Sequence, residues 1–293
     1  MVGYNQGAMK ISAVCWDVDK VWYPGYSTNF LAEKSNSDPG PLLQDFLSQG
    51  WFTLSDVDSW AMARRRGAKE PIESAKDLAE LLTDFHYEMK REDSDEPIIN
   101  MNQLREGKQA IISGLTMKQV REIADSIEYS PGLLEAIETV RRSGLYQVAF
   151  SDAPAPFIIY HVQRLGVDYG EAAPTMVRAG KQEMLFEPWM LQRDDISLAG
   201  AAGEFAKAGR VLTHLRQKGH SLSEVAIIDD SAVNIEPLLL PVFQAGGIAL
   251  GYNPTEVHKP IFRKYSIPIL KGLDLRAFAQ IVADRKKITE YCE

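Results

Sequence analysis

Residues 11–22, ISAVCWDVDKVW, carry an apolar run that ends in two carboxylates, Asp17 and Asp19. A run of this length, rich in small and β-branched residues, is typical of a buried strand. Because the strand ends here, both carboxylates can reach the space beyond its carboxyl edge, where open α/β sheets bind ligands. Burying two ionised carboxylates together is costly, and a hard divalent cation would relieve their repulsion. A polar strand end at a surface turn would account for the same pattern.

Length and composition indicate a globular protein. The 293 residues suit one large domain or two moderate ones, and the net charge of -8 argues against an extended nucleic-acid-binding surface. The two cysteines, Cys15 and Cys292, have neither metal-ligand nor disulfide spacing, which favours a reducing compartment. The chain shows no signal-peptide layout and no apolar run near the ~20 residues of a membrane span. We therefore expect a cytoplasmic protein that binds neither nucleic acid nor membrane.

A helical block follows the first strand. Amphipathic patterns predict helices at residues 41–47, 57–66, 72–91 and 117–127, and Thr116 with Gln119 fits a capping box at the start of the last one. We interpret residues 25–127 as a helical insertion. It contains Arg64, Arg65 and Arg66, which suit either a helix carboxy terminus or a cationic clamp for an anionic substrate.

The rest of the chain alternates strands and helices, which predicts a parallel sheet covered by helices. We expect strands at 11–18, 147–150, 225–228, 247–252 and 267–270, and helices at 133–143, 156–165, 205–219, 234–240 and 273–291. Residues 167–200 are harder to interpret, with short strands possible at 176–178 and 184–186. The predicted fold is therefore a Rossmann-like α/β core made of residues 1–24 and 128–293.

Three of the predicted strands end in polar residues: Asp17 and Asp19, then Ser151, then Asp229 and Asp230. The carboxyl ends of parallel strands share one edge of a sheet, so these side chains can converge although they are distant in sequence. Convergence would produce an acidic pocket with a hydroxyl group beside it. Such a pocket suits a divalent cation with oxygen ligands, and Mg²⁺ fits best.

Four segments together resemble the motifs of the haloacid dehalogenase (HAD) superfamily. Residues 17–21, DVDKV, are similar to its first motif, and Ser151 after an apolar strand is similar to the second. Lys207 near a helix start resembles the third, and residues 227–234, IIDDSAVN, resemble the fourth in its double-aspartate form. Each motif is weak alone, but their order and placement at strand ends are specific. The resemblance implies a HAD-type α/β core.

The resemblance also extends to the organisation of the chain. The helical insert at 25–127 and the stretch 130–134, SPGLL, are similar to members with a helical cap domain, including the phosphoserine phosphatase-like group. The cap agrees only in position and helicity. A cap generally restricts entry, so the resemblance implies a small phosphorylated substrate, with a phosphoprotein as the alternative.

The resemblance implies a phosphatase mechanism. Asp17 would attack phosphorus and form an aspartyl-phosphate, and Asp19 would act as general acid and then general base. Ser151 and Lys207 would bind the transferring phosphoryl oxygens. The presence of Asp19 indicates phosphoryl transfer rather than dehalogenation, which needs no such acid.

The resemblance implies Mg²⁺ as the cofactor. The ion would bind Asp17, the backbone carbonyl of Asp19 and Asp230, with Asp229 as a ligand or an anchor. Asn234 stands where many relatives have aspartate, so its role stays open.

Some features leave alternatives. Lys181 and Lys218 compete with Lys207 as the phosphate-binding lysine, although Lys207 is preferred because a helix start faces the same edge. A phospho-acceptor signalling module would use similar groups, but it should carry its lysine on a strand and lack the insert. A non-catalytic partner-binding protein of this fold is a further alternative. The substrate and the oligomeric state stay open.

Overall fold

The computed structural model of the protein describes residues 10–64, 72–91, 94, 96–173, 175–179, 184–188 and 204–293. The chain divides into two compact units. The first unit comprises Met1–Pro24, Ile127–Ala173 and Asp194–Glu293, and the second comprises Gly25–Ser126 and Pro174–Arg193. Within the described part of the chain, no helix has the length and apolar composition needed to cross a bilayer.

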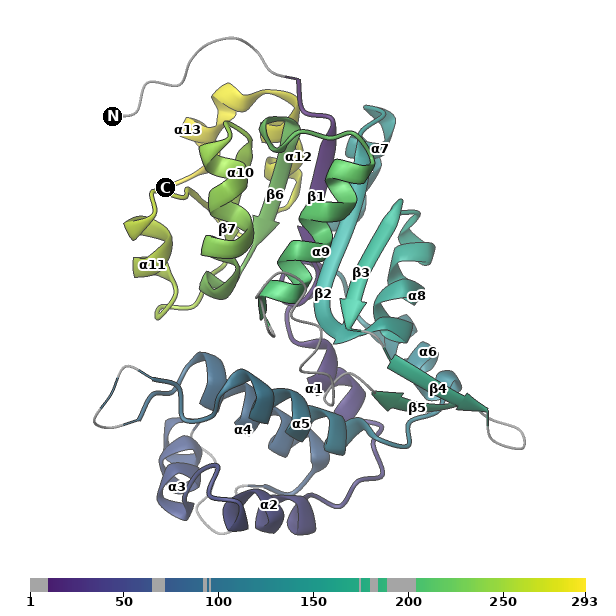
Figure 1. Ribbon diagram of the computed structural model, residues 1–293, viewed down its shortest axis with the longest axis vertical. Helices are drawn as coiled ribbons and strands as arrows, with labels where there is room; N and C mark the ends of the chain where they lie inside the picture. The colour runs from purple at the N-terminus through teal and green to yellow at the C-terminus, as the bar shows by residue number, and fades with distance from the viewer. Residues whose placement is uncertain are drawn as a thin grey trace. The chain divides into compact units, whose positions relative to one another are not determined.

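A parallel six-stranded sheet with the order β3-β2-β1-β6-β7-β8 forms the centre of the first unit (Figure 1). The strands are β1 (Ala13–Asp17), β2 (Tyr146–Pro154), β3 (Tyr169–Ala173), β6 (Val225–Asp229), β7 (Ile248–Tyr252) and β8 (Ile269–Leu270). All five residues of β1 are buried, because the strand lies between β2 and β6 and is covered on both faces. This agrees with the predicted Rossmann-like parallel core.

Helices cover both faces of this sheet. One layer contains α7 (Leu133–Arg142), α8 (Ala155–Leu165) and α12 (Arg276–Ala283), and the other contains α9 (Glu204–Gln217), α10 (Leu240–Gln244) and α11 (Lys259–Lys264). Alternate side chains of β1 point to the two different helix layers. The ring of Trp16 packs edge-on against Phe278 of α12, with ring centroids 5.0 Å apart, whereas Cys15 packs in a cluster with Val211 of α9.

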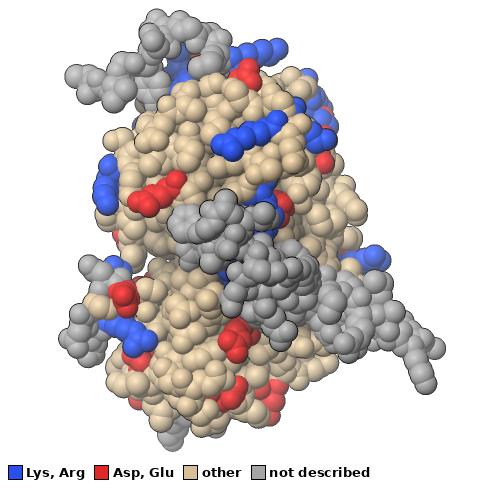
Figure 2. Space-filling model, viewed as in Figure 1, with Lys and Arg blue, Asp and Glu red and all other residues tan. Residues whose placement is uncertain are grey.

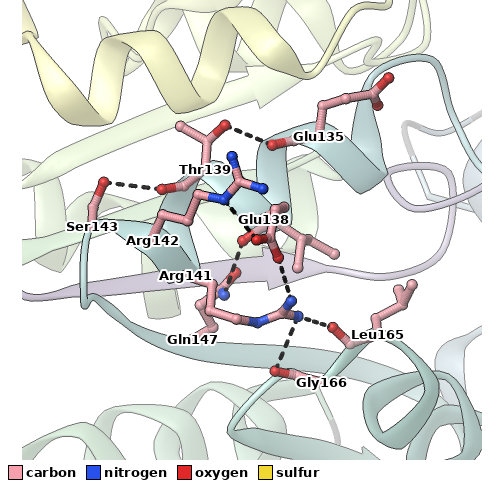
Figure 3. Close-up of polar contacts among 10 residues, drawn as sticks. Glu135, Glu138, Thr139, Arg141, Arg142, Ser143, Gln147, Leu165 and Gly166 are labelled. Carbon is pink, nitrogen blue, oxygen red and sulfur yellow. Dashed lines mark hydrogen bonds and ion pairs between the residues drawn. The ribbon is translucent and has the colours of Figure 1, made fainter.

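A polar junction connects α7 to the end of α8 (Figure 3). The guanidinium of Arg141 donates hydrogen bonds to the carbonyl of Leu165, to that of Gly166 at 3.4 Å, and to the carboxylate of Glu138. Gly166 ends α8 in the left-handed region (φ 63°), and a Cβ there would lie 2.9 Å from the Arg141 guanidinium. The positive φ at the helix end therefore favours glycine, and the absence of a side chain leaves room for the guanidinium.

The second unit is mainly helical. It contains α1 (Ser27–Ala32), α2 (Pro39–Ser48), α3 (Leu54–Ala63), α4 (Ala75–Tyr87), α5 (Met101–Ile112) and α6 (Met117–Ser126). Side chains cap the helix starts reciprocally. Thr53 with Asp56, Ser74 with Asp77 and Asn100 with Gln103 form capping boxes on α3, α4 and α5.

A two-stranded antiparallel hairpin also belongs to the second unit. It consists of β4 (Thr175–Ala179) and β5 (Met184–Pro188), and β5 contacts α5 and α6. The structure differs here from the expectation that residues 128–293 would form one core. An isolated hairpin is marginally stable, so it needs helices to pack on, and its antiparallel pairing does not extend a parallel sheet.

Several elements differ from the sequence predictions. Helices α1, α5 and α11 and strand β3 were not predicted. Helix 234–240 is instead a 3-10 turn (Ala232–Asn234), a π-helical turn (Ile235–Leu239) and α10. Pro241 has no N–H to donate into the ladder, and the Leu240 N–H instead bonds the carbonyl of Ile235. The predicted closing helix is broken into α12, a 3-10 turn (Arg285–Lys287) and α13 (Ile288–Tyr291).

On the face shown in Figure 2, the basic and acidic side chains of the described residues are scattered among uncharged ones. Cys15 and Cys292 are both free thiols, and both are buried.

Candidate active site

The carboxyl edge of the sheet in the first unit brings together the polar residues of β1, β2 and β6. Asp17 lies opposite Phe150, the residue before Ser151, and Trp16 lies opposite Ile228, the residue before Asp229. Ser151 is buried, with 1% of its surface exposed. Strand β2 continues beyond it to Pro154, so Ser151 lies within a strand instead of ending one. The pairing with β3 shifts register between Phe150 and Pro154, and such irregularities re-aim side chains at functional edges.

Three buried carboxylates form the centre of this edge. Asp17, Asp229 and Asp230 each place one carboxylate oxygen within 4.8 Å of the others, and their exposed fractions are 4%, 0% and 4%. Burial raises the pKa of all three, and their mutual repulsion raises the pKa of Asp17 and Asp230 further. Without a metal ion, the carboxyl groups of this cluster therefore tend to keep their protons. A divalent cation would relieve the repulsion between the ionised carboxylates.

Asp229 is held in place by two hydrogen bonds. Its Oδ1 accepts from the backbone N–H of Ser231 at 2.8 Å, and its Oδ2 accepts from the Asn234 side-chain amide at 2.8 Å. Asn234 reaches back because the chain turns directly after β6 into the 3-10 turn Ala232–Asn234. Asp230 instead faces a cation, with Lys20 Nζ 3.8 Å from its Oδ2. Asn234 therefore contacts the site through Asp229, whose carboxylate it orients.

Lys207 supplies positive charge to the same edge. It lies in the first turn of α9 and is 4% exposed. Its Nζ is 3.7 Å from Asp17 Oδ1 and 3.3 Å from a carboxylate oxygen of Asp152. Asp152, directly after Ser151, was not identified from the sequence, because a single carboxylate next to a motif has no distinctive pattern.

The two other candidate lysines differ from Lys207. Lys218 follows the carboxy-terminal end of α9, with its Nζ 5.9 Å from the centre of the Tyr146 ring. Tyr146 begins β2, at the opposite edge of the sheet from Ser151. Lys181 lies outside the described residues.

Asp19 is oriented separately from the three-carboxylate cluster. It is partly exposed, and its Oδ1 accepts a hydrogen bond from the Tyr23 hydroxyl at 2.9 Å. The intervening Lys20 has a left-handed backbone (φ 61°), which is uncommon for a residue with a side chain. Sequence analysis identified Asp19 but not Tyr23, because the residue pattern does not show which side chain the turn after β1 brings back to Asp19.

Arg64 is engaged within the second unit. Its guanidinium donates two hydrogen bonds to the Asp84 carboxylate, Nε to Oδ2 at 2.8 Å and Nη2 to Oδ1 at 2.5 Å. The Trp60 indole N–H donates to the same carboxylate at 2.7 Å. These bonds pair α3 with α4 and account for Arg64 structurally. Arg65 and Arg66 lie outside the described residues.

Comparisons with known proteins identify the fold. No family model matches the sequence, and no curated protein sequence matches it. A phosphoserine phosphatase structure, a phospho-aspartyl intermediate analogue, is similar with a TM-score of 0.57 and 15% identity, covering 94% of this chain and 99% of that chain. A substrate-bound phosphoserine phosphatase complex gives 0.57 and 15%, covering 94% and 98%.

A HAD family hydrolase from Salmonella enterica subsp. enterica serovar Typhi is also similar, with a TM-score of 0.54 and 12% identity over 90% of this chain and 67% of that chain. At this level of identity the comparisons establish a shared fold. The chain has the α/β fold of the HAD hydrolases, in the arrangement found in phosphoserine phosphatases.

Proposed function

We propose that the protein is a Mg²⁺-dependent phosphatase that hydrolyses a small phosphomonoester through an aspartyl-phosphate intermediate. One observation carries the proposal: the buried Asp17 lies against both a lysine, Lys207, and two further carboxylates, Asp229 and Asp230. A carboxylate nucleophile for phosphoryl transfer needs cations on both the attacking and the transferring oxygens. Lys207 can supply one positive charge, and the carboxylates can bind a metal ion that supplies the other.

In the first half-reaction, an Asp17 oxygen attacks phosphorus as the ester P–O bond breaks. Asp19 gives its proton to the departing alcohol oxygen. In the second, Asp19 takes a proton from water, and the water oxygen attacks phosphorus. The Asp17–phosphorus bond then breaks, which regenerates the carboxylate and releases inorganic phosphate. Each proton that Asp19 loses in the first step is recovered in the second.

Lys207 and Ser151 would bind the transferring phosphoryl group. Lys207 is already desolvated beside Asp17, so its charge acts in a medium of low polarity. Its second partner, Asp152, is more exposed, with 32% of its side-chain surface accessible. We propose that the phosphoryl oxygens take the place of Asp152 as partners of this ammonium group.

The carboxylates fit a Mg²⁺ site. Asp17 and Asp230 would bind the ion together with the backbone carbonyl of Asp19, and Asp229, whose two oxygens already accept hydrogen bonds, would anchor the site from behind. When bound, Mg²⁺ would neutralise charge on the phosphoryl oxygens and screen the nucleophile from them. The attraction between Asp230 and Lys20 would then be weaker, because the ion would share the negative charge of Asp230.

We propose that the second unit is a cap that selects the substrate. The chain leaves the first unit at Pro24, a short distance in sequence after Asp19. Arg64 is committed to Asp84, and substrate recognition is assigned to other residues of this unit. We also propose a cytoplasmic location, which the two free thiols support.

The test is hydrolysis of p-nitrophenyl phosphate and of a panel of phosphometabolites, with Mg²⁺ and with EDTA. We expect Mg²⁺-dependent release of phosphate by the wild-type protein and a loss of at least ~10³-fold in Asp17→Asn. Asp284→Asn is the matched control, because this aspartate caps a 3-10 turn far from the site in sequence and fold. Equal activity of wild type and Asp17→Asn, or no activity on any ester or phosphopeptide, would contradict the proposal.

A further inference from the structure

We infer that Tyr23 is a positioning residue, which fixes the orientation of the Asp19 carboxyl group so that one defined oxygen exchanges the catalytic proton. The inference rests on the proposed function and names a residue that its chemistry requires but does not itself identify. Tyr23 is fully buried, and its hydroxyl donates to Asp19 Oδ1 at 2.9 Å.

The local backbone brings the two side chains together. The Trp22 N–H bonds the carbonyl of Val18 at 2.8 Å, which closes a single helix-like turn directly after β1. The left-handed backbone of Lys20 (φ 61°) lies inside this turn and reverses the chain between Asp19 and Tyr23. The backbones of these two residues also pair through an isolated bridge. The backbone of this turn therefore places the two side chains close enough to bond.

Surrounding rings hold Tyr23 in this orientation. Phe157 meets the Tyr23 ring edge-on, with centroids 6.1 Å apart and planes at 80°. The imidazole of His161 lies 5.8 Å away on a tilted plane. That imidazole is bonded in turn to the Tyr129 hydroxyl, 2.9 Å from its Nδ1. Both Phe157 and His161 belong to α8, so a rigid helix fixes the phenol that orients Asp19.

The hydrogen bond distinguishes the two oxygens of Asp19. Oδ1 accepts the tyrosine O–H, so in the acid form the transferable proton is carried on Oδ2. In the first half-reaction the Oδ2–H bond breaks as the proton moves to the alcohol oxygen and the ester P–O bond breaks. In the second, Oδ2 accepts a proton from the attacking water. Tyr23 keeps its own proton throughout and touches neither substrate nor phosphorus.

The decisive experiment compares esters whose alcohols differ in acidity. Departure of 2,4-dinitrophenolate needs little protonation, whereas departure of phenol depends on the acid. We expect Tyr23→Phe to lower kcat/KM for phenyl phosphate about tenfold and for 2,4-dinitrophenyl phosphate less than about twofold, since only part of the general-acid contribution is lost. Asp19→Asn should show the same selectivity with larger losses. The double variant should be no worse than Asp19→Asn, because both changes remove one function.

Tyr146→Phe is the matched control. It also deletes a tyrosine hydroxyl, but that hydroxyl bonds His214 at the edge of the sheet opposite Ser151. Its effect on kcat/KM should be equal for the two esters, and thermal unfolding of each variant verifies that it is folded. Equal losses for both esters in Tyr23→Phe, or additive losses in the double variant, would overturn the role of Tyr23 while leaving the phosphatase intact. Failure of the wild-type protein on every ester would overturn the proposed function and this inference together.

Discussion

Asn234 shows how one neutral side chain shapes the acidic cluster. Its amide donates to Asp229, and this hydrogen bond together with that from the Ser231 N–H holds the carboxylate in a fixed orientation. An aspartate at this position would lose the donor and add a fourth negative charge to a buried site. Neutrality at Asn234 therefore limits the repulsion that has to be offset when no cation is bound.

Asn234→Asp is expected to destabilise the protein most when metal is absent. At pH 8 in EDTA we expect unfolding at a temperature several degrees lower than wild type, since ~1 kcal/mol corresponds to roughly 2–4 °C in a domain of this size. Excess Mg²⁺ should recover most of that loss. Differential scanning fluorimetry with and without Mg²⁺ measures both, and an unchanged melting temperature in EDTA would show that the amide has no such role.

Asp17→Asn should separate stability from activity. Burial raises the pKa of Asp17 above its ordinary value, so its ionised form destabilises the metal-free fold as the pH rises. A neutral amide removes that charge. We therefore expect a higher melting temperature than wild type in EDTA at pH 8 and a smaller gain at pH 4, because the raised pKa of Asp17 favours the protonated wild-type carboxyl as the pH falls. A gain of the same size at both pH values would contradict this explanation.

At the scale of elements, α3 and α4 are joined through a single buried carboxylate. Asp84 is 5% exposed and accepts hydrogen bonds from the Trp60 indole and the Arg64 guanidinium. Glu88, by contrast, is a more distant partner of Arg64, at 3.5 Å, and is 35% exposed. Their difference in burial predicts different energetic weights for two carboxylates that face the same arginine.

Asp84→Ala is expected to lower the free energy of unfolding by about 2–4 kcal/mol, because it leaves a buried indole N–H and a guanidinium without their acceptor. Glu88→Gln should cost less than about 0.5 kcal/mol, as exposed ion pairs usually do. Urea unfolding followed by tryptophan fluorescence compares the two variants. Similar losses in both would mean that burial does not set the difference.

Elements with a strong local pattern were predictable from the sequence. Strands β1, β6 and β7 are continuous apolar runs, and the capping box of Thr116 and Gln119 is present at the start of α6. Convergence of the polar strand ends followed from parallel topology. Helix α5 was missed because polar residues dilute its pattern, although Asn100 and Gln103 signal its start. Gly107 within it reads as a breaker, yet a Cβ there would lie 2.4 Å from Leu82 of α4.

Contacts made by tertiary structure were not predictable. Strand β3 is short and carries Glu171, which pairs with Arg210 of α9, so its sequence lacks a clear apolar run. The bond from Tyr23 to Asp19 and the contact of Lys20 with Asp230 depend on how the chain turns after β1. Residue types alone do not specify such a turn.

At the scale of the molecule, stability should depend jointly on pH and Mg²⁺. Burial raises the pKa of Asp229 to about 6 and that of Asp230 to about 8. Because these folded-state values exceed the unfolded value of about 3.9, the unfolded chain holds fewer protons, and the metal-free protein loses stability as the pH rises from about 4 towards 8. A divalent cation replaces those protons.

The increase in melting temperature caused by a fixed Mg²⁺ concentration should therefore be larger at pH 8 than at pH 6, where the ion competes with bound protons. Thermal unfolding at both pH values, with and without about 5 mM Mg²⁺, tests this linkage. Asp230→Asn is the control, and its Mg²⁺-dependent increase should be small at either pH. A larger increase at pH 6 in the wild-type protein would contradict the sign.

The strand order has a consequence for biosynthesis. β1 leaves the ribosome before the other strands of its sheet, but its neighbours there are β2 and β6, and β6 begins only at Val225. At about 5–20 residues per second, this apolar strand waits roughly 10–40 s for its second neighbour. The helices from Ser27 to Ser126 make local contacts and can assemble in the meantime. The nascent chain therefore exposes an apolar strand edge until β6 is synthesised, and we expect chaperones that bind emerging polypeptides to bind β1.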